Sequence, residues 1–265
     1  MVEKPTHMCG NPSIAGNVHD SARRGFAFAA DAYEESRPTY PDEAVAWLTR
    51  ELELGPGRTV VDLAAGTGKL TRLLTPTDST VIAIEPVDEM RRTLAHTTPD
   101  ADARPGTAEL TGLPDASADA VTVAQAFHWF DGPAALAEIH RIMKPHGRLA
   151  VIYNVRDLDD PAQHAVDELL APYRGDTPSH RSGRWRAALD ETDLFRPADS
   201  REFPNVQTLD ADALVRRVAS TSFIADLPAP ERNRVLDKAR AIAPRQPDRF
   251  SFPYTTEIEI LDRAA

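Results

Sequence analysis

A glycine-bearing segment of this sequence has the spacing of a loop that binds a small ligand. The segment VVDLAAGTGKL places Gly66 and Gly68 directly after an apolar run and before a helical stretch. Glycines there let the backbone approach a ligand closely, and the free amides at the start of a helix face that ligand. A tight strand-to-helix turn that binds nothing is the alternative interpretation.

Two carboxylates accompany this loop. Asp62 lies near the end of the first apolar run, and Glu85 ends the next run along the chain. In a parallel sheet the ends of neighbouring strands lie side by side, so a carboxylate at Glu85 can accept both hydroxyls of a ribose. Asp62 favours a ligand that carries an ammonium group. For Glu85 the alternative is an acid stabilised by the dipole of the following helix, because Pro86 and Asp88 come next.

The spacing of the loop disfavours a nicotinamide dinucleotide. When the middle glycine of G-x-G-x-x-G is placed on Gly66, the first position is Ala64 and the third is Lys69. Lysine prevents the close packing of helix on strand that the third glycine permits. Asp62 also adds negative charge near the position that a pyrophosphate would occupy.

An aromatic run follows the third strand, at the sheet edge where open α/β sheets bind ligands. The run comprises Phe127, His128, Trp129 and Phe130. We expect it to form the wall that faces a reacting group. His128 is a candidate general base with a pKa near neutrality, and a structural role for the aromatic run is the alternative. Packing is the alternative role for Trp129 and Phe130.

The elements that position these residues alternate between strand and helix. Four apolar runs lie at residues 59–65, 80–86, 118–126 and 147–154. Helical segments at 69–74, 88–97 and 133–143 separate them, and another helix begins at Pro41 and Asp42. Apolar runs without polar alternation are typical of a parallel sheet covered by helices on both faces. Residues 99–118 are expected to form a loop.

The second half of the chain is richer in charge and proline. Helices are predicted at 160–172, 183–190, 210–221 and 229–242, and strands at 200–209 and 250–261. We expect these strands to complete the edge of the sheet and the helices to form a lid over the ligand. The predicted divisions are a mobile tail at 1–20 and one domain at 21–265, made of a core at 26–154, a lid at 155–245 and a final strand at 250–262.

Composition narrows the functional classes. The 265 residues carry a formal net charge of −11, which disfavours a nucleic-acid partner. Cys9 is the only cysteine, so an intrachain disulfide and a multi-thiolate metal site are excluded, and no metal is expected. We find neither a signal peptide nor a membrane span in the sequence and expect a cytoplasmic protein, a monomer or a homodimer.

Other catalytic frameworks are absent from the sequence. It contains no G-x-S-x-G elbow, no G-x-x-x-x-G-K-[ST] loop and no H-E-x-x-H pair. Hydrolase and nucleoside triphosphatase activities are therefore disfavoured.

Several motifs together resemble the class I S-adenosylmethionine-dependent methyltransferases of the methyltransferase-11 type. They are VVDLAAGTGKLT, VIAIEP, GTAELTGLPDASADAV, AQAFHWFD and MKPHGRLAVIYN, and they cover about residues 26 to 154. The spacing of Tyr33, Arg37, Pro38, Tyr40 and Pro41 narrows the resemblance to a branch related to trans-aconitate methyltransferase. The resemblance implies a Rossmann-like, doubly wound α/β fold with a mostly parallel seven-stranded sheet and a helical lid.

Carried over by position, the resemblance implies a binding site for S-adenosylmethionine and its product S-adenosylhomocysteine. Asp62, Gly66 and Gly68 would hold the methionine part of the cofactor, and Glu85 its ribose. The remaining expected cofactor contacts are Tyr33, Arg37, Tyr40, Ala64, Thr67, Pro86, Ala108, Glu109, Gln125, Ala126 and Phe127. Ala64 stands where the family commonly has glycine, and its methyl group could weaken or reshape cofactor binding.

A small-molecule metabolite or natural product is the expected methyl acceptor. The candidate substrate contacts, chosen by position and residue type, are Trp129, Asn154, His180, Arg181 and Trp185. An arginine can hold a carboxylate with two parallel hydrogen bonds. For each of the last four, an ordinary surface residue is the alternative. The resemblance favours transfer to oxygen. Three alternatives stay open: a protein that retains the cofactor for a non-methylating reaction such as a cyclisation, a non-catalytic binding subunit, and a nucleic-acid methyltransferase.

Overall fold

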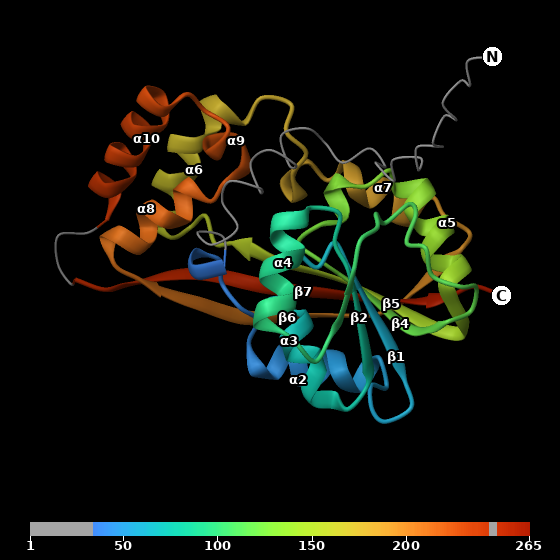
Figure 1. Ribbon diagram of the computed structural model, residues 1–265. Helices are drawn as coiled ribbons and strands as arrows, with labels where there is room; N and C mark the ends of the chain where they lie inside the picture. Colours follow the sequence, from blue (N-terminus) through green and yellow to red (C-terminus); the bar gives the residue numbers. More distant parts are fainter. Residues whose placement is uncertain (1–33, 244–247) are drawn as a thin grey trace, which may run out of the picture.

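The fold is described from a computed structural model, for residues 34–243 and 248–265. Its centre is one seven-stranded sheet with the order β3-β2-β1-β4-β5-β7-β6 (Figure 1). The strands are β1 Thr59–Leu63, β2 Thr80–Ile84, β3 Asp102–Arg104, β4 Ala118–Ala124, β5 Met143–Arg156, β6 Phe195–Leu209 and β7 Phe250–Arg263. The predicted tail at 1–20 and Tyr33 lie outside the described residues.

Strands β1 to β5 run parallel to one another, and β7 lies antiparallel between β5 and β6. This mostly parallel α/β sheet with seven strands confirms the predicted fold class. The polar segment at 99–118 was expected to be a loop, but β3 forms there by pairing Ala103 with Ala83 at the edge of the sheet. Its sequence, Asp-Ala-Arg, has no apolar run because an edge strand this short buries little surface.

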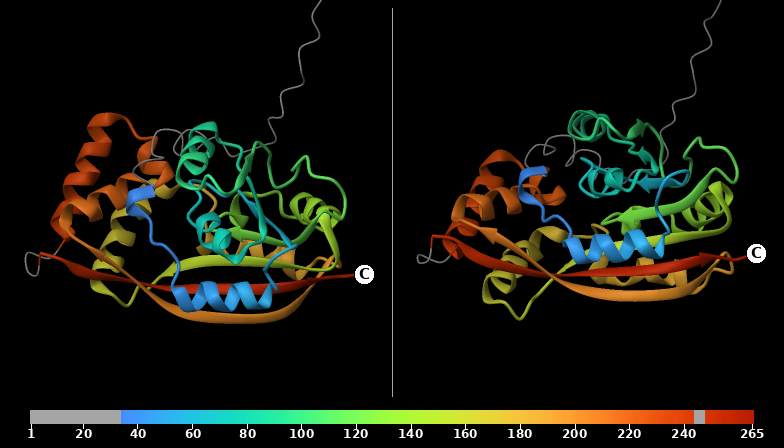
Figure 2. Two further views of the ribbon diagram at one scale, coloured as in Figure 1. Left: turned by 60° about the horizontal axis from the view of Figure 1, so that its bottom comes forward. Right: turned by 90° about the horizontal axis from the view of Figure 1, so that it is seen from below.

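Helices cover both faces of the sheet. The first group is α2 Asp42–Glu51, α3 Thr71–Leu74 and α4 Asp88–Thr97, and the second is α5 Gly132–Ile142 and α7 Arg184–Asp190. Helix α2 lies along β6 and β7, where Trp47 packs on Phe203 with ring centroids 5.9 Å apart (Figure 2). The 3-10 helices are η1 Thr75–Thr77, η2 Phe127–Trp129 and η3 His180–Ser182.

The helices that were expected to form one lid lie in two different places in the structure. Helices α6 Pro161–Arg174, α8 Ala211–Ala219, α9 Ser222–Ala225 and α10 Ala229–Ile242 form one helical unit beside the ends of β6 and β7 (Figure 1). An apolar core holds this unit, with Val166, Leu214 and Val235 packed against Phe252 and Tyr254. Helix α7 was expected in the lid but instead packs against α5, on one face of the sheet.

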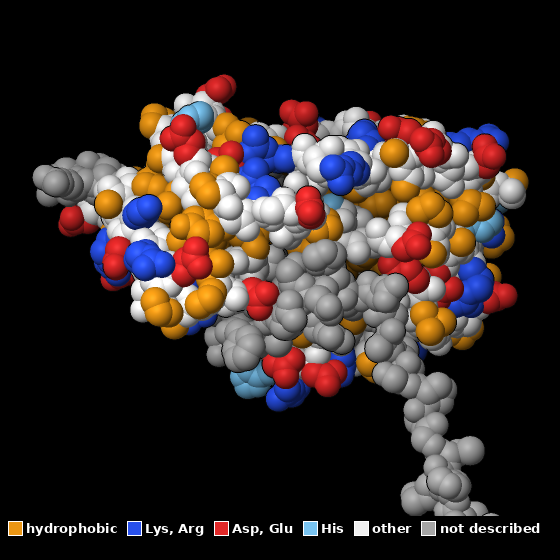
Figure 3. Space-filling model, turned by 90° about the horizontal axis from the view of Figure 1, so that it is seen from above, with side chains coloured by type: hydrophobic (Ala, Val, Ile, Leu, Met, Phe, Trp, Pro, Cys, Tyr) orange, Lys and Arg blue, Asp and Glu red, His pale blue; other side chains and the backbone are white. Residues whose placement is uncertain are grey.

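The surface carries charges of both signs. Viewed from above, acidic and basic side chains are interspersed over the described part of this face (Figure 3). Within residues 34–243 and 248–265, no helix is long and apolar enough to cross a bilayer.

Candidate functional site

A cavity of about 330 Å³ opens where β1, β4 and β5 end. Its walls come from the loop after β1, the residues after β4 and β5, and helices α6, α8 and α9. The predicted site residues that line it are Arg37, Tyr40, Asp62, Ala64, Gly66, Thr67, Gln125, His128, Trp129, Asn154, His180 and Arg181. The cavity therefore brings the predicted glycine loop and the predicted acceptor wall together.

Other predicted residues lie outside the lining of this cavity. They are Gly68, Glu85, Pro86, Ala108, Glu109, Ala126, Phe127 and Trp185. Most of them are buried in the surrounding protein and do not line the cavity themselves. Ala126 and Phe127, for example, are buried in the main hydrophobic core.

The loop after β1 has an unusual backbone. Ala64, Gly66 and Gly68 all have positive φ angles, of 51°, 60° and 86°. Gly66 lines the cavity, whereas a Cβ added to Gly68 would lie 3.0 Å from Leu94 Cγ of α4. Gly66 is thus the glycine that exposes backbone to a ligand, and Gly68 permits the close approach of α4.

Asp62 is buried below the loop, and its carboxylate is already hydrogen-bonded. Thr71 donates to Oδ2 over 2.7 Å, and Thr122 donates to Oδ1 over 2.9 Å. Burial raises the pKa of Asp62 to about 6, although both hydroxyls act against this rise. The carboxylate links the loop and α3 to β4, and a direct bond to an ammonium group stays a prediction.

Glu85 ends β2 beside the same loop and is 3% exposed. Its Oε2 accepts the amide of Gly66 over 2.8 Å, and its Oε1 accepts the amide of Val87 over 2.8 Å. Burial raises the pKa of Glu85 to about 7, against the effect of these two hydrogen bonds. Residues at the ends of β1 and β2 thus meet, as the parallel sheet predicted.

Gln125 directly follows β4 and has a φ of 61°. Its Nε2 is buried and has no hydrogen-bond partner within the part of the chain that the structure describes. A buried donor without a partner is costly, so a ligand that accepts a hydrogen bond would be favoured here.

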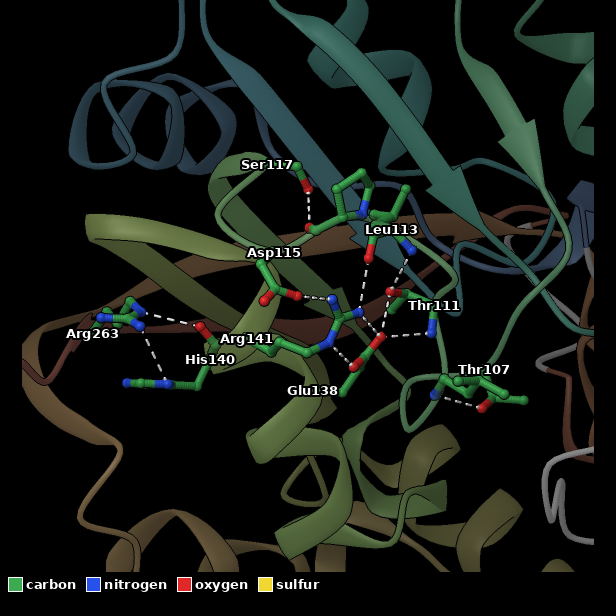
Figure 4. A network of polar contacts seen from close by, with 11 residues as sticks. Thr107, Thr111, Leu113, Asp115, Ser117, Glu138, His140, Arg141 and Arg263 are labelled. Carbon is green, nitrogen blue, oxygen red and sulfur yellow. Dashed lines mark hydrogen bonds and ion pairs between the residues drawn. The ribbon is translucent and has the colours of Figure 1, made fainter.

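The segment that carries Ala108 and Glu109 is held against α5. Ala108 is buried in the main hydrophobic core, and Glu109 accepts the amide of Asp131 over 3.0 Å. Farther along the same segment, Glu138 of α5 accepts both the amide and the hydroxyl of Thr111 (Figure 4).

An ion pair completes this attachment. Burial alone would raise the pKa of Glu138, but hydrogen bonds from Arg141 and Thr111 hold it below its usual range. Arg141 also reaches Asp115 and the carbonyl of Leu113 (Figure 4). The segment after β3 is therefore held against α5 by these contacts.

His128 lies on η2 in contact with Tyr153. The Tyr153 hydroxyl accepts the backbone amide of His128 over 3.1 Å and lies 3.2 Å from its Nδ1. Burial, with the nearby charges of His180 and Arg37, lowers the pKa of His128 to about 3. The expected pKa near neutrality is therefore corrected: the imidazole is neutral at physiological pH because it is desolvated among cationic groups.

The predicted substrate residues other than Trp129 fall into two sets: His180 and Trp185 belong to an aromatic cluster, and Arg181 and Asn154 make polar contacts with other segments. His180 stacks with Tyr153 at 4.1 Å between ring centroids, and Trp185 donates to the carbonyl of His180 over 2.9 Å. Trp185 lies outside the cavity lining and supports this aromatic cluster. Arg181 pairs with Asp167 on α6, and Asn154 donates to the carbonyl of Thr39.

Several cavity residues were missed in the sequence. Arg156 is the last residue of β5, Arg217 and Thr221 lie on and just after α8, and Tyr254 belongs to β7. One signal was available for Arg217: it shares the apolar face of a helix with the buried Leu214 and Val218. No metal centre is found, because no group of three His, Cys, Asp or Glu in the described ranges could hold an ion.

Comparison with known proteins relates both the fold and the sequence to methyltransferases. A family model described as a methyltransferase domain matches residues 61–151. An uncharacterized methyltransferase of Mycobacterium tuberculosis is 36% identical over 236 residues, which cover 87% of this chain and 92% of that protein. An uncharacterized methyltransferase-like protein of Schizosaccharomyces pombe is 36% identical over 217 residues, covering 80% of this chain and 84% of its own.

Solved structures share the architecture. The YcgJ protein of Bacillus subtilis superimposes with a TM-score of 0.55 at 19% identity, over 85% of this chain and all of that one (100%). At this identity the likeness concerns the fold alone, while the relatives at 36% identity establish the family. The chain belongs to the class I S-adenosylmethionine-dependent methyltransferases.

Proposed function

We propose that this protein transfers a methyl group from S-adenosylmethionine to an oxygen atom of a small-molecule metabolite or natural product. The observation that carries the proposal is that the glycine loop after β1 and the aromatic wall after β4 open onto one cavity. A displacement at a methyl group needs this closeness, because its rate depends on alignment of the reacting atoms.

The residues present fit this cofactor. Gly66 presents its backbone to the cavity, and Gln125 has a buried amide nitrogen with no partner in the described ranges. Glu85 lies outside the cavity lining and accepts two backbone amides, so it would accept the hydroxyls of a ribose after the Gly66 amide moves away from Oε2. We assign Asp62, Gly66 and Gln125 to the methionine end, Glu85 and Pro86 to the ribose, and Ala108 and Glu109 to the adenine. When bound, the cofactor supplies a methyl group activated by a positively charged sulfur.

The chain's own residues would orient the acceptor and exclude water. We propose that Trp129 and His128 contact the acceptor. The Tyr153 hydroxyl accepts the backbone amide of His128 and lies 3.2 Å from Nδ1, so we propose that its hydrogen is donated to Nδ1 and that the imidazole proton lies on Nε2. In this tautomer His128 donates a hydrogen bond to the acceptor, and removal of a proton by His128 stays a prediction.

Thermal unfolding of the purified protein with S-adenosylmethionine, S-adenosylhomocysteine or NAD tests the proposal. A ligand that binds only the folded state raises the unfolding temperature by mass action. We expect a rise with the first two ligands and none with NAD. The cofactor assignment would be wrong if neither of the first two raised it and the purified protein carried no bound cofactor.

Two variants separate the enzyme from a non-catalytic subunit. Glu85→Ala should abolish the rise with S-adenosylhomocysteine, while Glu89→Ala, at an exposed acid of α4, should preserve it. If function in the cell survived Glu85→Ala, the binding-subunit alternative would be supported. The trans-aconitate branch, the cytoplasmic location and the monomeric or homodimeric state stay predictions.

A further inference from the structure

Arginines concentrate at the side of the cavity formed by the helical unit. Arg156 extends from the end of β5, and Arg217 lies on α8. Arg174 and Arg181 also line this side, where Asp167 is the one acid among the described residues. Positive charge thus gathers in a pocket of a protein whose formal net charge is −11.

Arg217 is buried without a complete set of partners. Its side chain belongs to a residue that is 4% exposed, and its Nε donates to the Tyr254 hydroxyl over 3.2 Å. Its Nη1 is buried and has no hydrogen-bond partner among the residues described. Burying a charged group in this way is unfavourable unless a counter-charge arrives.

The acid in this pocket is already engaged elsewhere. Asp167 lies 2.8 Å from Arg174 and 2.5 Å from Arg181, whereas Arg156 is 4.0 Å away. Burial and the charge of Arg217 lower the pKa of Arg156 to about 10, which shows that Asp167 compensates it poorly. Among the described residues, Arg217 therefore has no ion pair, and Arg156, whose side chain is 20% exposed, has only the distant carboxylate of Asp167.

A further buried polar atom lies at the same side. Thr221 follows α8 and lines the cavity, and its Oγ1 has no hydrogen-bond partner within the described ranges. A hydroxyl and two guanidinium groups together can donate to both oxygens of one carboxylate. Arginine forks also hold phosphate, so inorganic phosphate is the competing anion in the test of this site.

We propose that Arg156, Arg217 and Thr221 bind a carboxylate that anchors the methyl acceptor, so that the substrate is a small organic acid whose methyl-accepting atom is a different oxygen. This inference rests on the proposed function for its acceptor, but the anion site itself does not depend on methyl transfer. The carboxylate keeps its charge throughout the reaction and fixes the orientation of the acceptor.

Binding of small carboxylates tests the proposal without turnover. Succinate and benzoate are titrated against the full chain at constant ionic strength, with succinamide, benzamide and inorganic phosphate in parallel. We expect at least one carboxylate to raise the unfolding temperature of the wild type more than phosphate does, and the matching amide to leave it unchanged. Arg217→Gln should weaken carboxylate binding about tenfold or more, because it removes hydrogen bonds made by a charged group.

Matched variants identify the cause of any loss. Arg216→Gln alters an exposed arginine of the same helix, so carboxylate binding should be unchanged. Arg217→Lys should retain part of the affinity for the carboxylate, because lysine keeps the positive charge but cannot donate the two parallel hydrogen bonds of a guanidinium group. If Arg217→Gln failed to fold, Arg156→Gln provides the same comparison at the end of β5.

Two results would overturn the proposal: carboxylates that bind the wild type and Arg217→Gln equally, or a panel in which no carboxylate stabilises the wild type more than phosphate and the amides do. Titration with S-adenosylhomocysteine separates this failure from failure of the proposed function. That ligand should stabilise Arg217→Gln as much as the wild type. Carboxylate binding without any effect of S-adenosylhomocysteine would preserve the anion site and contradict the methyltransferase proposal.

Discussion

Ala64 occupies a backbone position that favours glycine. Its φ of 51° is left-handed, where an alanine side chain costs about 1 kcal/mol. We therefore expect Ala64→Gly to stabilise the protein by up to about 1 kcal/mol, after subtraction of the entropy that glycine loses on folding. Urea unfolding measures the change.

The neighbouring alanine is the control for this prediction. Ala65 is absent from the residues with positive φ, so Ala65→Gly should destabilise the protein by about 0.5–1 kcal/mol. Equal destabilisation by both substitutions would contradict the strain that we assign to Ala64.

Glu85 links folding stability to pH. Its pKa of about 7 in the folded protein exceeds the ordinary value of 4.5, so the folded state binds a proton more tightly than the unfolded state. Its contribution is therefore fully present below pH 4.5 and is lost as the pH rises through 7. Relative to Glu85→Gln, the wild type should lose on the order of 3 kcal/mol between pH 4.5 and 7.5.

Urea unfolding of both proteins at several pH values measures this difference. Comparison with Glu85→Gln cancels most of the contribution of Asp62, whose raised pKa acts with the same sign. A stability difference that did not change with pH would show that Glu85 is not a carboxylate with a raised pKa.

At the scale of elements, the position of α7 depends on a glycine at the start of α5. A Cβ added to Gly132 would lie 2.4 Å from Cβ of Ala188, so the two helices can pack only because Gly132 has no side chain. Gly132→Ala should destabilise the protein by about 1–3 kcal/mol, since a core packed this closely cannot accept another methyl group without moving. Chemical unfolding measures the loss.

Gly55→Ala is the matched control for the helix contact. No atom lies within 4 Å of the position of its added Cβ, and its φ is not left-handed. Its free energy of unfolding should therefore change little. A similar loss in both variants would mean that helix contact is not the cause.

At the scale of the whole molecule, the last strand lies inside the sheet. Strand β7 pairs with β5 on one side and β6 on the other, so β6 has no other neighbour in the sheet. Deletion of residues 249–265 should therefore prevent folding, and circular dichroism should show no cooperative unfolding transition. Deletion of Ala265 alone should leave the transition intact, and a cooperative transition in the longer deletion would contradict this view of the sheet.

The sequence by itself determined the order of most strands and helices and the position of the glycine loop. This was possible because apolar runs and helical spacing are local properties, and because parallel strands bring their carboxyl ends to one edge. Glu85 and Gly66 could be placed together on this argument alone, and the structure joins them by a hydrogen bond.

Only the tertiary structure decided the features that depend on distant contacts. Strand β3 forms because it pairs with the edge of β2. Helix α7 packs against α5 and not in the expected lid, because Gly132 has no side chain that would block the contact. The pKa of His128 depends on burial and on charges brought from other segments. Arg156 and Arg217 line the same cavity although helices α6 and α7 and strand β6 lie between them in the chain, and no local pattern encodes this closeness.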